Sequence, residues 1–358
     1  MRVAIVHFWL TGMRGGEKVL EALCRLLPDA DIFTLFYDPG RVSELIRSRR
    51  VTASYLNPLR RYYRSLLPLM PSALESFDLR GYELVVSSES GPAKGVLTPA
   101  RTRHVCYCHT PPRYLWEFYP DYMHDWTKSA LKRAVMRPFA RNLRVWDFAS
   151  AARVDDFVAN SETVRRRIWK TYRRESTVVH PPVAVRSFQH CPARDYFLIV
   201  SELVAYKRLD YAVRLVARTG TRLKIAGNGP EYKRLRAQAG PSVEFCGRVS
   251  DSELRDLYAR SRALIVPGEE DFGITMVEAL ASGKPVIALG RGGVLDIVSP
   301  GDSANGVLYP EPSEEHLNAA LLHFEGMEKD IDPSVLQQSA ARFSEEVFQE
   351  KMGRILEL

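Results

Sequence analysis

Short runs rich in apolar residues alternate with amphipathic segments along most of the chain. Runs this short predict strands of a parallel sheet that helices cover on both faces. The segments between them carry apolar residues at helical spacing and predict helices. The pattern therefore predicts an α/β fold. The apolar runs cover residues 3–8, 32–36, 196–201, 223–227, 243–249, 263–267 and 285–289.

The chain is long enough for two such sheets. Its 358 residues are more than one core usually organises. The stiff pair Pro181-Pro182 also interrupts the alternation near its middle. We therefore expect an N-terminal domain over residues 1–187, a C-terminal domain over 188–339 and a helical tail at 340–358.

The charge balance indicates an anionic partner. The net charge is +7 and the isoelectric point is about 9.1, which suits a nucleic acid, anionic lipid headgroups or a phosphorylated small molecule. The sequence contains no zinc finger and no aromatic RNP motif, so nucleic acid is not an expected partner.

Targeting and redox features favour the cytoplasm. No apolar run approaches the roughly 20 residues that span a bilayer, and the chain begins directly on a predicted strand instead of a signal peptide. Its five cysteines form an odd set without metal-binding spacing, which fits a reducing compartment.

The stretch 263–293 concentrates groups suited to binding an anion. A predicted strand ends at Pro267, an acidic loop follows, and a helix begins near Thr275. Ligands of an open parallel sheet bind beyond the carboxyl ends of its strands, where a helix start favours negative charge. The backbone N–H groups that would face a phosphate belong to Gly273, Ile274 and Thr275.

Two carboxylates accompany this helix start. Glu270 lies in the loop and Glu278 lies inside the helix. Carboxylate oxygens accept hydrogen bonds from hydroxyl groups, so this pair suits a sugar and a ribose. An ordinary strand-loop-helix with solvated acids is the alternative for the pair taken alone.

A histidine ends another predicted strand, 104–109. Strand alternation places His104 and the two neighbouring cysteines on one face and His109 on the other, which argues against a metal site. His109 instead reaches the carboxyl edge of the sheet, where the turn at residues 110–112 fixes its approach to a ligand.

Two further segments bring phosphate-binding groups to strand ends. Gly15-Gly16 precedes a predicted helix and allows close backbone approach to a ligand, although a plain tight turn explains the pair equally well. Lys207-Arg208 follow the strand 196–201 and begin the next helix. A charged helix start in water is the plain alternative there.

Basic and apolar side chains are mixed in segments 55–70 and 128–146. We expect both to meet an anionic membrane surface, and a solvated face is the alternative. In the second segment, helical spacing puts the apolar side chains on one side, facing inward, and the arginines on the other. The apolar set is Leu131, Val135, Met136, Phe139, Leu143, Val145 and Trp146, and the basic set is Arg133, Arg137, Arg141 and Arg144.

These motifs together resemble those of the retaining glycosyltransferases of family 4. Residues 270–278 resemble the E-x7-E signature, and 107–116, YCHTPPRYLW, resemble the Y-x-H-T-P-x-R-Y-x-W motif of members that are often mannosyltransferases. Gly15-Gly16 is similar to the family's G-G-x-E-type loop. The resemblance spans nearly the whole chain. It implies the GT-B architecture, in which two Rossmann-like domains with parallel sheets face a central cleft and the tail helix returns to the first domain.

The resemblance also implies a role for each candidate residue. His109 would hydrogen-bond the donor sugar and Glu270 would contact it, while Lys207 would neutralise the diphosphate. Glu202 occupies the position of a usual arginine, so either Arg208 compensates or the diphosphate is held with one cation fewer. The remaining donor-binding residues would be Gly15, Gly16, Gly273, Ile274, Thr275 and, at the ribose, Glu278.

The implied activity is transfer of a hexose with retention, without a metal or another cofactor. The resemblance favours GDP-mannose over a UDP-sugar as donor. The basic-aromatic segments favour a lipid-linked glycan or polysaccharide precursor as acceptor, at the inner face of the membrane. Two alternatives remain: a nucleotide-sugar epimerase of GT-B shape, and a catalytically silent nucleotide-sugar-binding subunit, which Glu202 favours.

Overall fold

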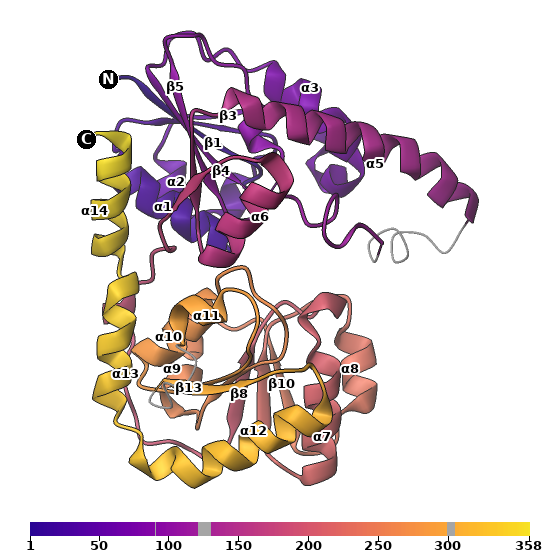
Figure 1. Ribbon diagram of the computed structural model, residues 1–358, viewed down its shortest axis with the longest axis vertical. Helices are drawn as coiled ribbons and strands as arrows, with labels where there is room; N and C mark the ends of the chain where they lie inside the picture. Colours follow the sequence, from indigo (N-terminus) through magenta and orange to yellow (C-terminus); the bar gives the residue numbers. More distant parts are fainter. Residues whose placement is uncertain (90, 121–129, 299–304) are drawn as a thin grey trace. The chain divides into compact units, whose positions relative to one another are not determined.

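The computed structural model divides the chain into two compact units (Figure 1). It describes residues 1–89, 91–120, 130–298 and 305–358, with the backbone alone for residues 64 and 130–135. Unit 1 comprises Met1–His180 and Phe348–Leu358, and unit 2 comprises Pro181–Val347.

The boundaries of the units differ by a few residues from 187/188 and 339/340, the positions expected from the sequence. The N–H of Val183 donates to the carbonyl of Phe343 at 2.9 Å, and Val183 also pairs with Ser344 in an isolated bridge. The segment after Pro181 is thereby joined to the segment before Phe348, so both belong to unit 2.

Unit 1 is built on a seven-stranded sheet in the order β3-β2-β1-β4-β5-β6-β7, and every neighbouring pair is parallel. Alternate residues of its strands pack on opposite faces. Val3 and Ile5 pack with α1 (Gly15–Leu26) and α14 (Glu345–Leu356), whereas Ala4 and Val6 pack with α3 (Met70–Glu75). The strands are β1 (Val3–His7), β2 (Asp31–Thr34), β3 (Val51–Ala53), β4 (Leu84–Glu89), β5 (Arg103–Cys108), β6 (Asp156–Ala159) and β7 (Ser176–Val178).

The helices of unit 1 cover both faces of this sheet. The tail expected to return to the first domain forms α14, and its Phe348 ring lies 5.7 Å from the ring of Tyr107 in β5. The helices are α1 (Gly15–Leu26), α2 (Glu44–Arg47), α3 (Met70–Glu75), α5 (Ala130–Ser150), α6 (Glu162–Tyr172) and α14 (Glu345–Leu356).

Unit 2 contains a six-stranded parallel sheet in the order β10-β9-β8-β11-β12-β13. Helices α7, α8 and α12 pack on one face, and α9, α10, α11 and α13 pack on the other. The predicted α/β class with two Rossmann-like domains is confirmed. The strands are β8 (Phe197–Val200), β9 (Leu223–Ala226), β10 (Val243–Gly247), β11 (Leu264–Val266), β12 (Val286–Leu289) and β13 (Gly306–Tyr309). The helices are α7 (Leu209–Thr219), α8 (Tyr232–Gln238), α9 (Asp251–Arg260), α10 (Ile274–Ala281), α11 (Val294–Ile297), α12 (Glu314–Met327) and α13 (Pro333–Ala340).

The prediction for the 128–146 helix is partly wrong. Phe139 and Val145 were expected to face inward but are 46% and 58% exposed. The helix instead buries Ala140, Asp147 and Ser150. Asp147 pairs with a buried lysine, so a polar contact sets which face of α5 is inward. Lys128 lies outside the described residues, as do the side chains of Leu131, Arg133 and Val135.

The strand orders fix where ligands bind in each unit. In unit 1 the order reverses between β1 and β4, and in unit 2 it reverses between β8 and β11. Loops that leave two such strands in opposite directions open a crevice at the carboxyl edge of the sheet. The candidate residues of each unit lie at this edge.

Candidate active site

The candidate residues of unit 1 gather beside the β1–β4 switch point. His109 follows β5, and its backbone N–H donates to the Glu89 carbonyl at 2.6 Å. Its Nε2 lies 3.0 Å from the Ser88 hydroxyl at the end of β4. An ideal Cβ on Gly16 would lie 3.7 Å from the same Nε2. The structure therefore brings His109 and Gly16 together at the carboxyl edge of the sheet, as the sequence predicted.

Gly15 and Gly16 form the first turn of α1, which begins directly at the site. Glu17 is buried in that turn, where its carboxylate accepts a hydrogen bond of 2.9 Å from the N–H of Arg14. Its other oxygen lies 3.9 Å from Nε2 of His7, the last residue of β1. The contacts of Glu17 with Arg14 and His7 therefore fix the start of α1.

Burial keeps His109 neutral. Removal from solvent, with His7 as a lesser cause, lowers the pKa of His109 to about 3. A neutral imidazole has one ring donor and one ring acceptor, so His109 is suited to hydrogen-bonding hydroxyl groups. It is not suited to supplying positive charge.

Sequence reasoning missed His7, Glu17 and Ser88. Two of them carry a usable signal, because they are polar residues at the carboxyl ends of apolar strands, in VAIVH and LVVSSE. A titratable or hydroxyl side chain at that position of a parallel strand lies at the ligand edge. Glu17 follows the glycine pair but would be read as an ordinary surface residue of a helix.

A buried ion cluster lies behind the His109 segment. The Lys94 ammonium pairs with Asp147 of α5 and lies 3.5 Å from a carboxylate oxygen of Glu89, and all three side chains are buried. Asp147 also accepts hydrogen bonds from Trp116 Nε1 at 2.7 Å and from the Tyr172 hydroxyl at 3.0 Å. The cluster ties β4, α5, α6 and the segment after His109 into one body.

Burial and charge oppose each other in this cluster. Burial raises the pKa of Glu89 to about 7, against the lowering effect of Lys94. Burial tends to lower the pKa of Lys94, but the charges of Asp147 and Glu89 raise it above its usual value. Lys94 therefore stays charged, and one cation faces two carboxyl groups.

In unit 2, Lys207 and Glu270 meet across the β8–β11 switch point. Lys207 ends the turn η6 (Ala205–Lys207) after β8, and Glu270 lies in the loop after β11. The Lys207 ammonium forms an ion pair with Glu270 Oε2. Burial alone would lower the pKa of Lys207, but Glu270 raises it, so the lysine is a cation.

Glycines allow the loops that carry Lys207 and Glu270 to approach each other closely. An ideal Cβ on Gly268 would lie 2.6 Å from the carbonyl oxygen of Lys207, which brings the two loops into backbone contact. The N–H of Gly293 donates to the Glu270 carbonyl at 2.8 Å. A Cβ on Gly292, whose φ is +83°, would approach the same carbonyl oxygen to 2.4 Å. Only glycine fits these approaches.

Helix α10 begins beside Glu270, as predicted. Gly273 precedes it with a φ of +100°, and an ideal Cβ there would lie 3.5 Å from Cβ of Glu270. Ile274 and Thr275 are its first two residues, whose N–H groups have no acceptor within the helix. The structure therefore brings Lys207, Glu270 and this amide-rich helix start together.

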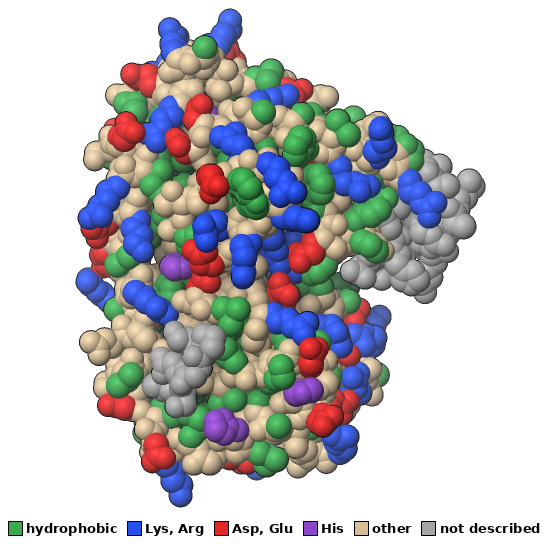
Figure 2. Space-filling view, viewed as in Figure 1, with side chains coloured by type: hydrophobic (Ala, Val, Ile, Leu, Met, Phe, Trp, Pro, Cys, Tyr) green, Lys and Arg blue, Asp and Glu red, His purple; other side chains and the backbone are tan. Residues whose placement is uncertain are grey.

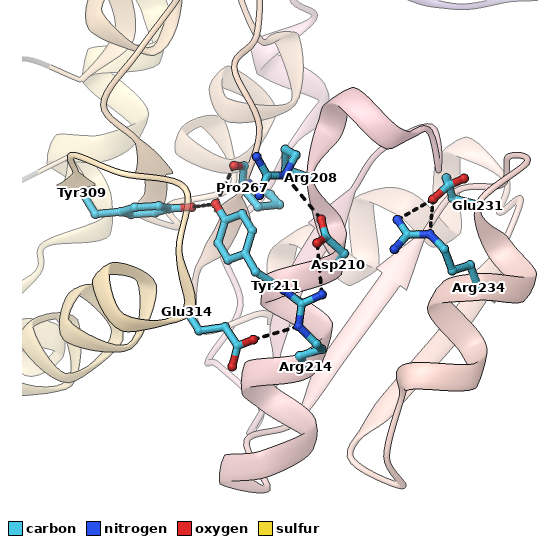
Figure 3. A network of polar contacts seen from close by, with 9 residues as sticks. All are labelled: Arg208, Asp210, Tyr211, Arg214, Glu231, Arg234, Pro267, Tyr309 and Glu314. Atoms are coloured by element: carbon cyan, nitrogen blue, oxygen red, sulfur yellow. Dashed lines mark hydrogen bonds and ion pairs between the residues drawn. The ribbon is translucent and has the colours of Figure 1, made fainter. Parts of the chain in front are cut away.

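Arg208 follows Lys207 in a left-handed backbone conformation, with a φ of +53°. Its guanidinium Nε lies 3.5 Å from Asp210, which also pairs with Arg214 at 3.1 Å (Figure 3). The Tyr211 hydroxyl, from the same helix, donates to the Pro267 carbonyl at 2.6 Å and so joins α7 to the end of β11. Non-glycine residues adopt this conformation rarely, and such residues cluster at functional sites.

Glu278 is placed differently from Glu270. Its side chain is buried in α10, where one oxygen accepts a hydrogen bond of 2.9 Å from the hydroxyl of the buried Tyr258. Its role at a ribose stays a prediction. Sequence reasoning missed Tyr258, which carries no local signal because its partner is 20 residues away.

No group of three or more His, Cys, Asp or Glu side chains is arranged to hold a metal ion within the described ranges. Across the same ranges, no helix combines the length and the apolar character that crossing a bilayer requires.

Family models match the chain over almost all of its length. The model described as Glycosyltransferase Family 4 matches residues 13–186, and the model described as Glycosyl transferases group 1 matches residues 186–343.

Curated relatives match part of the chain. A GDP-mannose-dependent alpha-mannosyltransferase of Mycobacterium tuberculosis is 37% identical over 118 residues, which are 33% of this chain and 30% of that protein. The O-antigen chain mannosyltransferase RfbU of Salmonella typhimurium is 31% identical over 180 residues, 46% of this chain and 49% of that protein. The chain thus aligns with half or less of the length of these two relatives.

Solved structures match the whole chain. The lipopolysaccharide outer core galactosyltransferase WaaB superposes with a TM-score of 0.70 at 18% identity, covering 99% of both chains. HepE of Anabaena, in complex with UDP, superposes with a TM-score of 0.71 at 15% identity, covering 100% of both chains. At these identities the likeness shows the fold, which is the GT-B fold of these enzymes.

Proposed function

The chain belongs to glycosyltransferase family 4, group 1, and from this premise we propose that it transfers mannose from GDP-mannose to a glycan acceptor with retained configuration. The observation that carries the proposal is the Lys207–Glu270 pair beside the start of α10. Those groups suit a sugar diphosphate. GDP-mannose-dependent relatives among the proteins that match favour mannose and guanine over other donors.

The difficult step is departure of the nucleoside diphosphate, because negative charge builds on the leaving phosphate. Lys207 is a preorganised cation whose position Glu270 fixes before any donor binds. The N–H groups of Ile274 and Thr275, which have no acceptor inside α10, add donors at the helix start beside Glu270. Fixed charges and dipoles of this kind stabilise developing charge without a divalent ion. We therefore assign the chemistry to protein groups alone.

The sugar is oriented by neutral or anionic groups. The imidazole of His109 hydrogen-bonds a sugar hydroxyl, and Oε1 of Glu270 accepts a bond from another while Oε2 stays paired with Lys207. The leaving phosphate takes the proton of the acceptor hydroxyl, so no separate base is assigned. In this scheme Glu270 orients the sugar and does not attack it.

We expect nucleoside diphosphates to raise the melting temperature in a panel of GDP, UDP and their sugars. A ligand at 100 times its Kd adds about 2.7 kcal/mol to the free energy of unfolding, which corresponds to a shift of several degrees. GDP and GDP-mannose are expected to give the largest shifts, because the proposed donor is a guanosine derivative. Guanosine, which lacks the diphosphate, is the control.

Three outcomes of that panel and of a companion turnover assay separate the alternatives. Absence of any shift with a nucleoside diphosphate contradicts the proposal. Conversion of the donor sugar without an acceptor indicates an epimerase. A shift without release of GDP, in the presence of acceptor glycans, indicates a silent binding subunit.

The acceptor is proposed to be lipid-linked, because unit 1 presents a mixed basic and apolar surface. Exposed Phe139, Val145 and Phe148 lie on α5 with exposed Arg137 and Arg141. Figure 2 shows basic and hydrophobic side chains side by side over α5. Such a mixture suits the interface of an anionic membrane, where rings enter the headgroup region and arginines meet phosphates.

The 3₁₀-helical segment η2 (Asn57–Leu69) extends this surface. Its Leu67 lines a small cavity together with Leu143 and Trp146 of α5, so the two segments are neighbours. The exposed side chains that η2 and its flank add are Tyr55, Leu59, Arg60, Arg61, Tyr62 and Leu69.

Changing Arg137 and Arg141 together to glutamate is expected to reduce co-sedimentation with phosphatidylserine-containing vesicles. Each basic residue near such a surface contributes about 1 kcal/mol, so the pair accounts for about a 30-fold loss of partitioning or more. Arg165→Glu together with Arg166→Glu, on an exposed face of α6, is the matched control. Equal binding by the double variant and the control contradicts the membrane assignment.

A further inference from the structure

His7 is a buried polar side chain that the proposed chemistry does not use. It is the last residue of β1 and is 0% exposed. Neither of its ring nitrogens has a hydrogen-bond partner in the part of the chain that the structure describes. Buried polar groups of folded proteins are nearly always hydrogen-bonded. An imidazole with both nitrogens unpaired therefore points to a ligand that completes its hydrogen bonds.

The His7 ring faces the place where the candidate ligand-binding residues of unit 1 meet. An ideal Cβ on Gly16 would lie 3.7 Å from Cε1 of His7, 3.7 Å from Nε2 of His109 and 3.8 Å from Cε1 of Phe8. These are ordinary van der Waals distances, so a carbon or oxygen atom fits there. Cε1 is the ring carbon between the two nitrogens, so the edge of His7 that carries both of them is turned toward Gly16. Gly16 and His109 are partly exposed, and His7 lies directly behind them.

Glu17 determines which nitrogen of His7 can receive a hydrogen bond. Its buried carboxylate lies 3.9 Å from Nε2 of His7, and negative charge on that side of the ring favours the proton on Nε2. Nδ1 then carries a lone pair and is an acceptor. The ligand group at Nδ1 must therefore be a donor. A hydroxyl group meets this requirement, whereas a fully ionised phosphate has no proton to donate.

The neighbouring His109 indicates which molecule carries that hydroxyl group. Its imidazole is neutral, because burial lowers its pKa to about 3, and in the proposed mechanism it holds a hydroxyl of the transferred sugar. Ser88 joins the two histidines, since it pairs with His7 across β1 and β4 and its hydroxyl lies 3.0 Å from Nε2 of His109. Both rings contact the one position beside Gly16. Two hydroxyl groups of a single sugar ring can therefore reach the two histidines.

We propose that His7 hydrogen-bonds a second hydroxyl group of the transferred sugar, beside the one that His109 holds. The sugar hydroxyl donates to Nδ1 of His7, and no proton is transferred. Glu17 acts through His7 and is a positioning residue. The inference rests on the proposed function and deepens it, because it makes recognition of the sugar depend on two histidines of unit 1.

The test compares the Kd of GDP-mannose with the Kd of GDP, by calorimetric titration of the full chain. His7→Phe keeps an aromatic ring but removes both nitrogens. It is expected to weaken the binding of GDP-mannose by about tenfold, which is the effect of losing one hydrogen bond. Binding of GDP, which lacks the sugar, is expected to stay unchanged. His104→Phe is the matched control, because His104 is equally buried but lies near the start of β5, at the opposite edge of the sheet.

Analogues of GDP-mannose that each lack one hydroxyl group identify the contact itself. Removing the hydroxyl that bonds His7 should weaken binding by about tenfold in the wild type and should make no difference in His7→Phe, where the contact is already lost. A merely structural role of His7 would not produce this compensation at one hydroxyl group.

Gly16→Ala provides a second variant that does not alter His7. Its methyl group fits without a clash, so the melting temperature should not fall. The methyl group occupies the position beside both histidines, however, and should weaken the binding of GDP-mannose more than that of GDP.

Equal losses for GDP and GDP-mannose in His7→Phe overturn the proposal, because His7 then acts on the fold or on the diphosphate. A wild-type ratio of the two Kd values in both His7→Phe and Gly16→Ala overturns it as well, since water alone then bonds His7. If GDP does not bind to the wild type, the proposed function is contradicted, and the same comparison of UDP with UDP-glucose still tests His7. Failure of every nucleoside diphosphate sugar to bind overturns both.

Discussion

Replacing Lys207 with alanine is expected to lower kcat/KM for sugar transfer by about 100-fold to 1,000-fold. That is the usual effect of removing one preorganised group that stabilises transition-state charge. The loss should fall mainly on kcat, because charge on the leaving diphosphate is greatest in the transition state. The measurement is the rate of GDP release as a function of GDP-mannose concentration, with the acceptor glycan at saturation.

Controls for Lys207→Ala separate chemistry from folding. Lys224→Ala removes a half-exposed lysine of the same unit that pairs with Glu244 at 2.8 Å, and it should leave the rate unchanged. Excess chelator should leave the wild-type rate unchanged as well, because we assign stabilisation of the charge on the leaving diphosphate to protein groups and not to a metal ion. A Lys207→Ala variant that keeps the wild-type rate, or a wild type that stops on chelation, contradicts the assignment.

Replacing Lys94 with methionine is expected to reduce the free energy of unfolding by about 3–5 kcal/mol. The change leaves Glu89 and Asp147 buried without the cation that faces both of them. Urea unfolding followed by fluorescence measures the loss. The exposed Lys351 of α14 provides the matched control, Lys351→Met, for which a change of under about 0.5 kcal/mol is expected.

The pH dependence of the Lys94→Met variant has a definite sign. Without the Lys94 ammonium, only the backbone N–H of residue 94, 3.1 Å from Glu89 Oε2, opposes the burial that already raises the pKa of Glu89 to about 7, so the folded variant binds more protons than its unfolded chain. Its stability relative to the wild type should therefore improve as the pH falls toward about 7, below which Glu89 is protonated in both folded proteins and the difference levels off. Adding Glu89→Gln and Asp147→Asn should restore part of the loss, because no unpaired charge then remains buried. A loss no larger than that of Lys351→Met contradicts the account.

Strand positions and the ligand edge could be predicted from the sequence for a simple reason. Apolar runs such as 3–8 and 263–267 are buried on both faces, so local composition specifies them without knowledge of their neighbours. Turn glycines mark where strands end. Since parallel strands end at a common edge, His109 and Gly16 could be assigned together, although 93 residues separate them.

Long-range polar pairing could not be predicted in this way. Nothing in the sequence around Lys94 indicates that its ammonium is buried beside Asp147, 53 residues away. The same pair determines which face of α5 is inward, so helical periodicity alone gave the wrong orientation for Phe139 and Val145. The hydrogen bond between Tyr258 and Glu278 belongs to the same class.

The glycine contacts around Lys207 and Glu270 bear on how the proposed donor site could change during evolution. Side chains cannot be added at Gly268, Gly292 or Gly293 without moving the backbone that carries the two charged groups. Substitutions at these three glycines are therefore disfavoured. A change of nucleotide preference has to come from side chains such as Glu202, which borders the crevice but does not hold the two loops together. Departures from a family pattern should then accumulate at such bordering positions while the charge-bearing loops stay as they are.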